Sequence, residues 1–303
     1  MIVAFHFLFF FLVQRIVADD APNDEFDRLD PKAPKFFAVD IDGTLYTDEG
    51  PGMARNVVAF GKAFSRGYNV FLATGRSPRS ARNILGENFF LSTGYSGYPG
   101  VYLDGALVYD KDGQIIRDDP LKPQFVEKFA KLTAEDCRKY TPIFVTSDII
   151  FTVCPLLKEE ACLYESYSDI SGIMEVPVES LKYYNIYKIF CMNGVDALNA
   201  INATNEDCHM ASTSAGLTQI LSPTADKAAG VKALLGYFGT DFSNCGCAGD
   251  GLNDVELMKA ANFSYAVGNA MPAAKSAAKY RVTHTNHTGG VAKILNEVYG
   301  IVV

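Results

Sequence analysis

The chain has 303 residues, enough to bury a substantial core and to form two domains. Its apolar content of 49% is that of a soluble globular protein. The formal net charge of −8 argues against nucleic acid or an anionic membrane surface as a partner.

The first segment of the chain differs from the rest. Residues 2–13 are almost wholly apolar, and a small residue, Ala18, precedes an acidic and polar run. Because this apolar run is too short to span a bilayer comfortably, we expect a cleaved signal peptide at 1–18 and a polar linker at 19–33. An uncleaved anchor and a misassigned start codon are the alternatives. The mature protein is then expected in the secretory pathway or secreted, without a stable membrane partner; a cytoplasmic protein is the alternative.

The first predicted strand is the apolar run Phe36–Val39, which leads into Asp40-Ile-Asp-Gly-Thr-Leu45. Two carboxylates, Asp40 and Asp42, therefore follow the carboxyl end of a strand, where open α/β sheets carry their chemistry. One carboxylate there can attack an electrophile or bind a cation, and the other can move a proton. An acidic turn without a function is the alternative.

A second strand, Tyr68–Ala73, follows a predicted helix at Arg55–Arg66 and leads into Thr74-Gly75-Arg76. A hydroxyl, a glycine and an arginine at a strand end suit a phosphate or another oxyanion. Ser77-Pro78 is typical of a helix N-cap followed by proline, so the N–H groups of the next helix point at the same place.

The middle of the chain changes pattern after a third strand, Val101–Leu103. Hairpins and helices without strict strand–helix alternation occupy 120–216, which predicts a separate α/β domain inserted into the core. The core is expected to consist of 34–119 and 217–303. The further strands expected are 106–109, 114–117, 143–146, 149–153, 173–176, 186–192 and 209–214, with a helical stretch at 195–205.

The last part of the chain supplies a cation and further oxygen ligands. Lys227 opens a predicted helix at Ala225–Phe238, and the small, apolar strand Asn244–Ala248 ends in Gly249-Asp-Gly-Leu-Asn-Asp254. The carboxylates and the amide of this loop are hard oxygen ligands of the kind that Mg²⁺ takes. The joint occurrence of these motifs at strand ends and helix starts indicates one site.

This set of motifs resembles the haloacid dehalogenase (HAD) superfamily of aspartate-nucleophile phosphatases, and within it the Cof-like branch. The resemblance runs from about Pro34 to the C-terminus. It implies a Rossmann-like core with a parallel sheet, an inserted α/β cap and a small phosphate ester as substrate. One position departs from the usual Asn-Gly-Ala pattern of that branch, because the chain has Asp104-Gly-Ala.

The resemblance also implies roles for single residues. Asp40 would be the nucleophile and Asp42 the general acid and base, with Mg²⁺ as cofactor. The implied Mg²⁺ ligands are Asp40, the backbone carbonyl of Asp42, Asp250 and Asp254. The implied phosphate-binding residues are Thr74, Gly75, Lys227 and Asn253, and the residues expected at the substrate rim are Arg76, Asp104 and Asn286.

Three functions remain open at this point. The first is a Mg²⁺-dependent phosphomonoester hydrolase acting on a small metabolite such as a sugar phosphate. The second is a phosphomutase of the phosphomannomutase type, against which the single arginine of 120–216, Arg138, argues. The third is a noncatalytic binding protein on this scaffold, against which the intact motifs argue. Oligomeric state does not follow from the sequence.

The seven cysteines do not define a disulfide framework by their spacing. Cys245 and Cys247 lie two apart on a predicted central strand and are expected to be small core residues. One or two disulfides are expected among the remaining five if the protein enters a secretory lumen. Those five are Cys137, Cys154, Cys162, Cys191 and Cys208.

Overall fold

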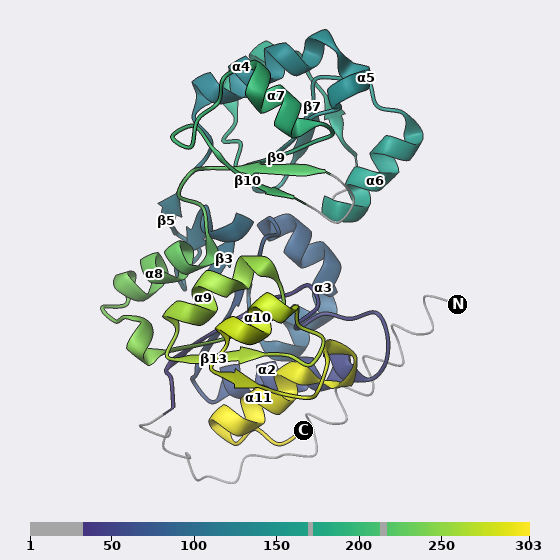
Figure 1. Ribbon diagram of the computed structural model, residues 1–303. Coiled ribbons are helices and arrows are strands. Elements are labelled where there is room, and N and C mark those ends of the chain that lie inside the picture. Colours follow the sequence, from purple (N-terminus) through teal and green to yellow (C-terminus); the bar gives the residue numbers. More distant parts are fainter. Residues whose placement is uncertain (1–32, 169–171, 213–216) are drawn as a thin grey trace.

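The larger of two sheets forms the core of the molecule (Figure 1). The computed structural model describes residues 33–168, 172–212 and 217–303. Eight strands are arranged in the order β14-β13-β12-β1-β2-β3-β4-β5, and all run parallel except β4, which is antiparallel to both of its neighbours. The strands are β1 (Phe36–Val39), β2 (Asn69–Ala73), β3 (Gly100–Tyr102), β4 (Leu107–Tyr109), β5 (Ile115–Asp118), β12 (Cys245–Gly249), β13 (Phe263–Ala266) and β14 (Tyr280–Arg281).

Helices cover both faces of this sheet. The chain moves from β1 toward β3 in one direction and from β12 toward β14 in the other, and right-handed crossovers then place the connecting helices on opposite faces. One group packs together as α2, α3 and α11, and the other as α8, α9 and α10. The helices are α2 (Gly52–Ser65), α3 (Pro78–Thr93), α8 (Lys227–Tyr237), α9 (Val255–Ala260), α10 (Pro272–Ala277) and α11 (Gly290–Tyr299), with short 3₁₀ turns η1 (Leu103–Gly105), η3 (Phe242–Asn244), η4 (Leu252–Asp254) and η5 (Asn286–Thr288).

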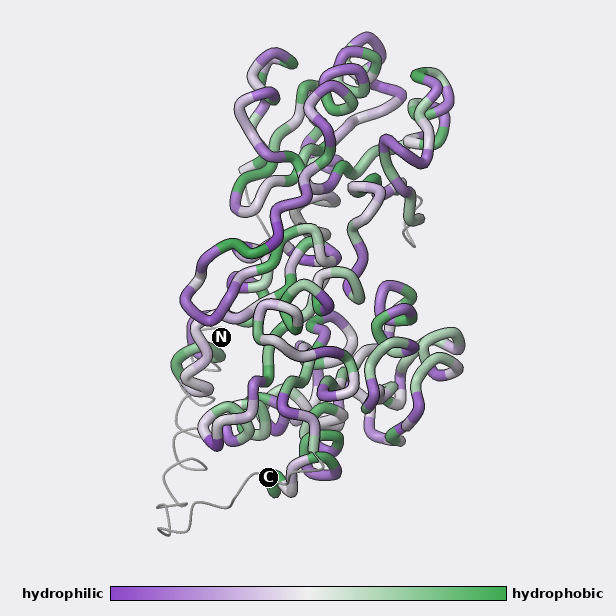
Figure 2. Tube along the Cα trace, turned by 90° about the vertical axis from the view of Figure 1, so that its left-hand side faces the viewer, coloured by the Kyte–Doolittle hydropathy of each residue, from purple (hydrophilic) through white to green (hydrophobic). Residues whose placement is uncertain are grey.

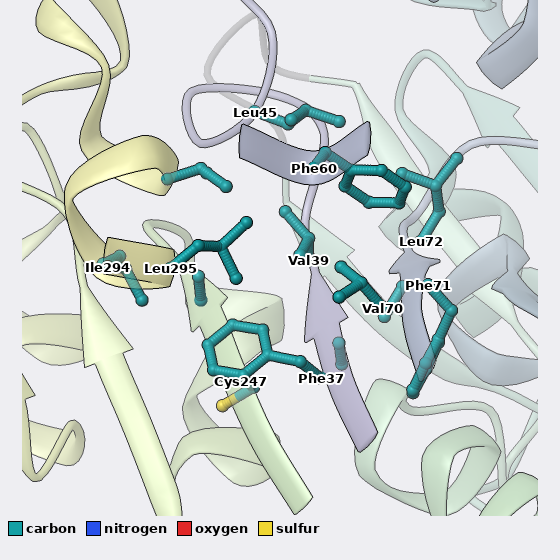
Figure 3. Packing of buried hydrophobic residues seen from close by; sticks show 14 of the residues in the cluster. Phe37, Val39, Leu45, Phe60, Val70, Phe71, Leu72, Cys247, Ile294 and Leu295 are labelled. Carbon is teal, nitrogen blue, oxygen red and sulfur yellow. The ribbon is translucent and has the colours of Figure 1, made fainter. Parts of the chain in front are cut away.

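The centre of the sheet is apolar on both faces. Phe37 and Val39 of β1 are fully buried, as is Phe71 of the neighbouring β2 (Figure 3). Cys247 of β12 lies in the same cluster with Ile294 of α11. Such strands read as continuous apolar runs because helices cover both faces, and this explains why they were recognisable in the sequence. The expectation that Cys245 and Cys247 are core residues is confirmed.

The second sheet forms a separate lobe on one side of the core (Figures 1 and 2). Its order is β10-β11-β9-β6-β7-β8, mostly antiparallel. The predicted α/β class, with a parallel core and a second sheet domain, is confirmed. The elements of the second lobe are β6 (Ile143–Val145), β7 (Ile150–Thr152), β8 (Met174–Glu175), β9 (Lys188–Cys191), β10 (His209–Ser212), β11 (Thr218–Leu221), α4 (Pro123–Glu135), α5 (Cys137–Tyr140), α6 (Lys158–Ser168), α7 (Gly194–Ala200) and η2 (Val178–Tyr183).

Alternation along the strands divides the second sheet into two faces. Phe144 of β6 belongs to the cluster beneath α4 and α7, on the side away from the core. Its neighbours Ile143 and Val145 point the other way and pack with Leu103 and Leu107 of the core. The period of two in a strand therefore gives the second lobe its own core and, on the opposite face, an apolar contact with the larger sheet domain.

Two details of the second lobe differ from the sequence prediction. Strand β11 lies beyond residue 216 but pairs with β9 and β10, so the second sheet extends to Leu221. The predicted strand 186–192 is shorter in the structure. The 3₁₀ turn η2 ends at Tyr183, and β9 begins at Lys188 as an interior strand between β11 and β6. Pairing over long sequence distances decides both points.

A disulfide joins Cys137 and Cys154 within the second lobe. The other five cysteines are free thiols, four of them buried and Cys162 exposed. One of the expected bridges is therefore present among the residues that the structure describes.

Loss of this bridge is expected to destabilise the second lobe. It closes a loop of 17 residues, and closure of a loop of that length stabilises by roughly 3 kcal/mol through the unfolded chain. We expect a Cys137→Ser, Cys154→Ser double variant to lower the melting temperature measured by calorimetry, and Cys162→Ser to leave it unchanged. An equal melting temperature of the wild-type protein with and without reductant would contradict the bridge.

Among the described residues, every helix is too short or too polar to cross a bilayer. The predicted signal peptide at 1–18 lies outside the residues that the structure describes, as does nearly all of the linker at 19–33.

Candidate active site

The predicted motifs meet at one edge of the core sheet. Asp40 directly follows β1 and Asp250 directly follows β12, and these two strands are parallel neighbours. Their carboxyl ends therefore lie side by side, although the two aspartates are far apart in the sequence.

Lys227 holds two of the carboxylates in place. Its ammonium lies 2.7 Å from Asp40 Oδ1 and 2.6 Å from Asp254 Oδ1, and its side chain is fully buried. Asp226 caps the start of α8 by accepting a hydrogen bond from the Ala229 N–H, and this fixes Lys227 as the first helical residue. Lys227 therefore pairs with Asp40 at the carboxyl end of β1.

A cluster of three carboxylates forms around this lysine. Asp40, Asp250 and Asp254 each offer an oxygen within 4.8 Å of the others. Asp254 Oδ2 accepts hydrogen bonds from the N–H groups of Asp250 and Gly251, so both of its oxygens already have partners. Asp250 Oδ1 accepts one from the Thr44 hydroxyl at 2.8 Å.

Gly43 makes room for this cluster. Its φ of +70° is in the left-handed region, and a Cβ at this position would collide with the Asp250 carboxylate. The glycine of the first motif is therefore required by two independent features of the site.

The electrostatics of the cluster favour a bound cation. Burial raises the pKa of Asp40 well above its usual range, against the opposing charge of Lys227. Burial also raises the pKa of Asp250 to about 6, against the hydrogen bond from Thr44. Burial would lower the pKa of Lys227, but the charges of Asp254 and Asp40 outweigh it and raise that pKa. One buried lysine thus does not offset three carboxylates, and their hard oxygens suit Mg²⁺.

Asp42 lies at the open side of the site, with half of its side chain exposed. Arg76 binds its carboxylate in a bidentate manner, with Nε at 2.8 Å from Oδ2 and Nη2 at 2.6 Å from Oδ1. Arg76 also donates to Ser80 Oγ at 2.9 Å. Asp42 is therefore held by a residue of the second motif, an interaction that sequence reasoning missed.

The second motif folds as expected around the start of α3. Ser77 caps the helix by accepting from the Ser80 N–H, and Pro78 is the first helical residue. Thr74 is buried, and its hydroxyl accepts a hydrogen bond from the Arg76 N–H. The turn thereby presents Gly75 and the helix N-terminus to the site.

Asp104 connects the two lobes. It is buried in a left-handed conformation with φ of 53°, and its Oδ2 lies 2.7 Å from the ammonium of Lys188 in β9. Its Oδ1 accepts a hydrogen bond from the Asn253 amide at 2.9 Å. Lys188 also donates to the Gly75 carbonyl at 2.8 Å. A carboxylate of the core, a lysine of the second lobe and a predicted phosphate-binding residue therefore form one network.

A cavity of about 410 Å³ opens between the two lobes at this point. The described residues that line this cavity do not include Thr74, Lys227 and Asp254, which are buried. The predicted site residues that line it are Asp40, Asp42, Gly75, Arg76, Asp104, Asp250 and Asn253, joined by Ser77, Ser80, Leu103, Val145, Lys188, Phe190, Gln219 and Gly251.

Asn286 does not lie at the rim of this cavity. It is buried, its N–H donates to Asn269 Oδ1, and its amide donates to the Tyr46 carbonyl at 3.1 Å. Asn286 thus links two loops of the core, and its expected place at the substrate rim is not what the structure shows.

The second lobe supplies residues that sequence reasoning missed: Val145, Lys188, Phe190 and Gln219 line the cavity. The sequence does mark Lys188 as unusual, because it begins the apolar run Lys188-Ile-Phe-Cys, where a buried side chain is expected. Which face of the strand points into the cavity depended on the pairing of β9 with β6 and β11.

The fold and the site together define a class of enzyme. A parallel α/β core with an inserted second sheet, an Asp-x-Asp motif after the first strand and a buried lysine beside it are the features of a capped, aspartate-dependent phosphohydrolase. The chain matches the family model of haloacid dehalogenase-like hydrolases over residues 37–295, and it belongs to this family. It is a HAD-type phosphatase with relatives in the Cof-like branch, as the sequence predicted.

Individual relatives are distant. The chain is 25% identical over 78% of its length to an HMP-PP phosphatase of Escherichia coli, of which it covers 84%. It is 27% identical over 92% of its length to the chloroplastic endoribonuclease YBEY of Arabidopsis thaliana. The chain spans about half of that relative, 49% of its length, so the activity in its name is not carried over.

Solved structures show the same fold. A candidate HAD/COF-like hydrolase from Plasmodium vivax superimposes with a TM-score of 0.76 at 24% identity, covering 88% of this chain and 96% of the other. A sugar phosphatase of HAD subclass IIB superimposes with a TM-score of 0.71 at 21% identity, covering 88% and 99%. Phosphatases of the HAD family use Mg²⁺, and the cluster of Asp40, Asp250 and Asp254 has the donors for such an ion.

Proposed function

We propose that the protein is a Mg²⁺-dependent phosphomonoesterase that acts on a small phosphorylated metabolite, a sugar phosphate, through an aspartyl-phosphate on Asp40. The observation that carries this proposal is the position of Asp40. Its carboxylate lines the cavity, Lys227 fixes Oδ1, and the carboxylate of Asp42 lines the same cavity. Lys227 thereby leaves Oδ2 of Asp40 to attack phosphorus.

The chain's own groups supply two balanced steps. Oδ2 of Asp40 forms a bond to phosphorus while the ester P–O bond breaks, and Asp42, released from Arg76 and protonated before this step, gives its proton to the leaving alkoxide. Water then attacks the phosphoryl group, its proton goes to Asp42, and the bond to Asp40 breaks to release phosphate. Gly75 and Asn253 line the cavity, and the N–H of Gly75 and the amide of Asn253 would bind the phosphoryl oxygens.

A bound Mg²⁺ would be held by Asp40, Asp250 and the Asp42 carbonyl, with Asp254 bound to it directly or through water. The ion would offset the repulsion between the carboxylates and a phosphate dianion. That repulsion is about 4 kcal/mol at 4 Å in a medium of effective dielectric constant 20. Asp250 is the better placed of the two later aspartates, because Asp254 already accepts bonds with both oxygens.

The proposed substrate class rests on the cavity. Its volume of about 410 Å³ is in the range of sites for small ligands. One structurally similar protein is a sugar phosphatase. The direct test is an assay of purified protein on a panel of sugar phosphates, with and without Mg²⁺. Absence of Mg²⁺-dependent phosphate release across such a panel would overturn the proposed substrate class.

The phosphomutase alternative is less well supported. A mutase must retain and reorient a bisphosphate, which calls for several arginines around the site. Arg138 belongs to α5 and is not among the described residues that line the cavity. The intact catalytic residues likewise favour an enzyme over a noncatalytic binding protein.

The role of Asp42 predicts a dependence on the leaving group. We expect Asp42→Asn to lower kcat by roughly 10²–10⁴-fold on alkyl phosphates, because the alkoxide then leaves without a proton. With p-nitrophenyl phosphate the loss should be much smaller for the first step, since nitrophenolate needs no proton. Equal losses with both kinds of ester, measured in burst-phase assays, would contradict proton donation by Asp42.

We also propose that the protein resides in or passes through the secretory pathway. The bridge between Cys137 and Cys154 supports this, since such disulfides persist in oxidising compartments. Native protein is expected to begin near Asp19. Deletion of residues 1–18 is expected to redirect the protein to the cytosol and to leave its activity unchanged. An intact Met1 on native cytosolic protein, found by N-terminal sequencing, would contradict this proposal and leave the phosphatase unaffected.

A further inference from the structure

The second lobe brings a buried lysine to the wall of the cavity. The side chain of Lys188 is 5% exposed, and its ammonium donates two hydrogen bonds, to Asp104 Oδ2 at 2.7 Å and to the Gly75 carbonyl at 2.8 Å, while it lies 5.7 Å from the centre of the Phe190 ring. Asp104 is equally enclosed, at 10% exposed. An ammonium has three N–H donors, so one of them remains for a bound molecule.

The cations on the cavity wall are each paired with a carboxylate. Of the described residues that line the cavity, the cations are Arg76 and Lys188. Arg76 is bound to Asp42 through two hydrogen bonds. The second lobe contributes Lys188 with Val145, Phe190 and Gln219, and its single charge is offset by Asp104.

Asp104 stays ionised under any ordinary assay condition. Burial alone would raise its pKa, but the charges of Lys188 and Lys227 and the hydrogen bonds from Lys188 and Asn253 outweigh burial and lower the pKa to about 2. A second anionic group on the substrate would therefore meet a lysine that is already neutralised. It would also lie close to the buried charge of Asp104.

We propose that Asp104 is a specificity-determining residue: by neutralising Lys188 it restricts the cavity to phosphate esters whose leaving group is uncharged, such as polyols and sugars, and selects against leaving groups that carry a second anion. The remaining N–H of Lys188 and the amide of Gln219 then donate to hydroxyl groups of the leaving group. This inference rests on the proposed phosphatase function and names its substrate class.

Matched pairs of substrates isolate the charge of the leaving group. Glycerol 3-phosphate and 3-phosphoglycerate share the phosphoryl group and differ in whether a hydroxymethyl or a carboxylate ends the chain. Glucitol 6-phosphate and 6-phosphogluconate form a longer pair with the same difference. For each pair the quantity of interest is the acid-to-neutral ratio of kcat/KM, with the same ratio of affinities measured by calorimetry.

The variants are expected to move this ratio in opposite directions. Asp104→Asn keeps the shape of the side chain and leaves Lys188 unpaired, so the ratio should rise about tenfold or more. Lys188→Met leaves Asp104 unpaired, so the ratio should fall. The double variant removes both charges and should return the ratio to near the wild-type value. Glu127→Gln, which removes an exposed charge from α4 of the second lobe, is the control and should not change the ratio.

A merely structural role for the pair has a different outcome. If Asp104 and Lys188 only hold the lobes together, their substitution lowers activity and affinity equally for the acidic and the neutral substrate. The acid-to-neutral ratio then stays constant, and this result would overturn the inference. If the wild-type protein releases no phosphate from any of these substrates, the proposed function is contradicted. The affinity ratio would then still decide the role of Asp104.

Discussion

An Asp40→Asn variant is expected to lose turnover of every phosphate ester by roughly 10⁴-fold or more, because an amide oxygen is a poor nucleophile. Among the described residues, no other carboxylate both lines the cavity and forms an ion pair with Lys227. Asparagine has nearly the same shape, and its oxygen can still accept the hydrogen bond from Lys227. The loss should therefore be one of chemistry and not of fold.

The fold of this variant should be preserved. Burial raises the pKa of Asp40, so its charge costs free energy in the folded state, and its removal relieves repulsion from Asp250 and Asp254. Thermal unfolding is expected to occur at or above the wild-type temperature. Asp48→Asn, an exposed aspartate after the same motif, is the matched control and should retain full activity.

Turnover within about tenfold of wild type by Asp40→Asn would refute the covalent mechanism. The direct readout is mass spectrometry of protein quenched during turnover, in which the wild-type chain should carry one phosphoryl group that hydroxylamine removes and the variant none. Phosphorylation at a different aspartate would reassign the nucleophile without changing the class of enzyme.

Removal of the divalent cation is the second change with a large expected effect. Excess EDTA should abolish turnover, and Mg²⁺ should restore it, because the cluster of Asp40, Asp250 and Asp254 leaves buried negative charge beside the phosphate. Ca²⁺ should inhibit, since its larger and looser coordination disturbs the in-line arrangement of nucleophile and leaving group.

An Asp250→Ala variant should lose activity together with its response to Mg²⁺. The carboxylate of Asp250 has one hydrogen bond from a side chain, that of Thr44, so its removal leaves the ion pair of Lys227 with Asp254 in place. Asp112→Ala, at an exposed turn of the hairpin between β4 and β5, is the control. Full activity in EDTA, or Mg²⁺ activation of Asp250→Ala with wild-type affinity, would refute the assignment of this aspartate.

The sequence by itself was sufficient to predict the core and the members of the carboxylate cluster. Strands such as Phe36–Val39 are apolar throughout because helices cover both faces, so they can be recognised from local composition. In a parallel sheet the carboxyl ends of neighbouring strands share one edge, so Asp40 and Asp250 had to converge once both strands were assigned.

Tertiary structure alone decided what surrounds that cluster. Lys188 and Asp104 are 84 residues apart, and their contact depends on how β9 pairs within the second sheet and how that sheet packs on the core. Side-chain positions in space likewise decide that Arg76 binds Asp42. They also decide that Cys137 and Cys154, of the seven cysteines, form the disulfide. Local periodicity reports which face of an element is buried, whereas the partner on that face is selected by packing between segments remote in sequence.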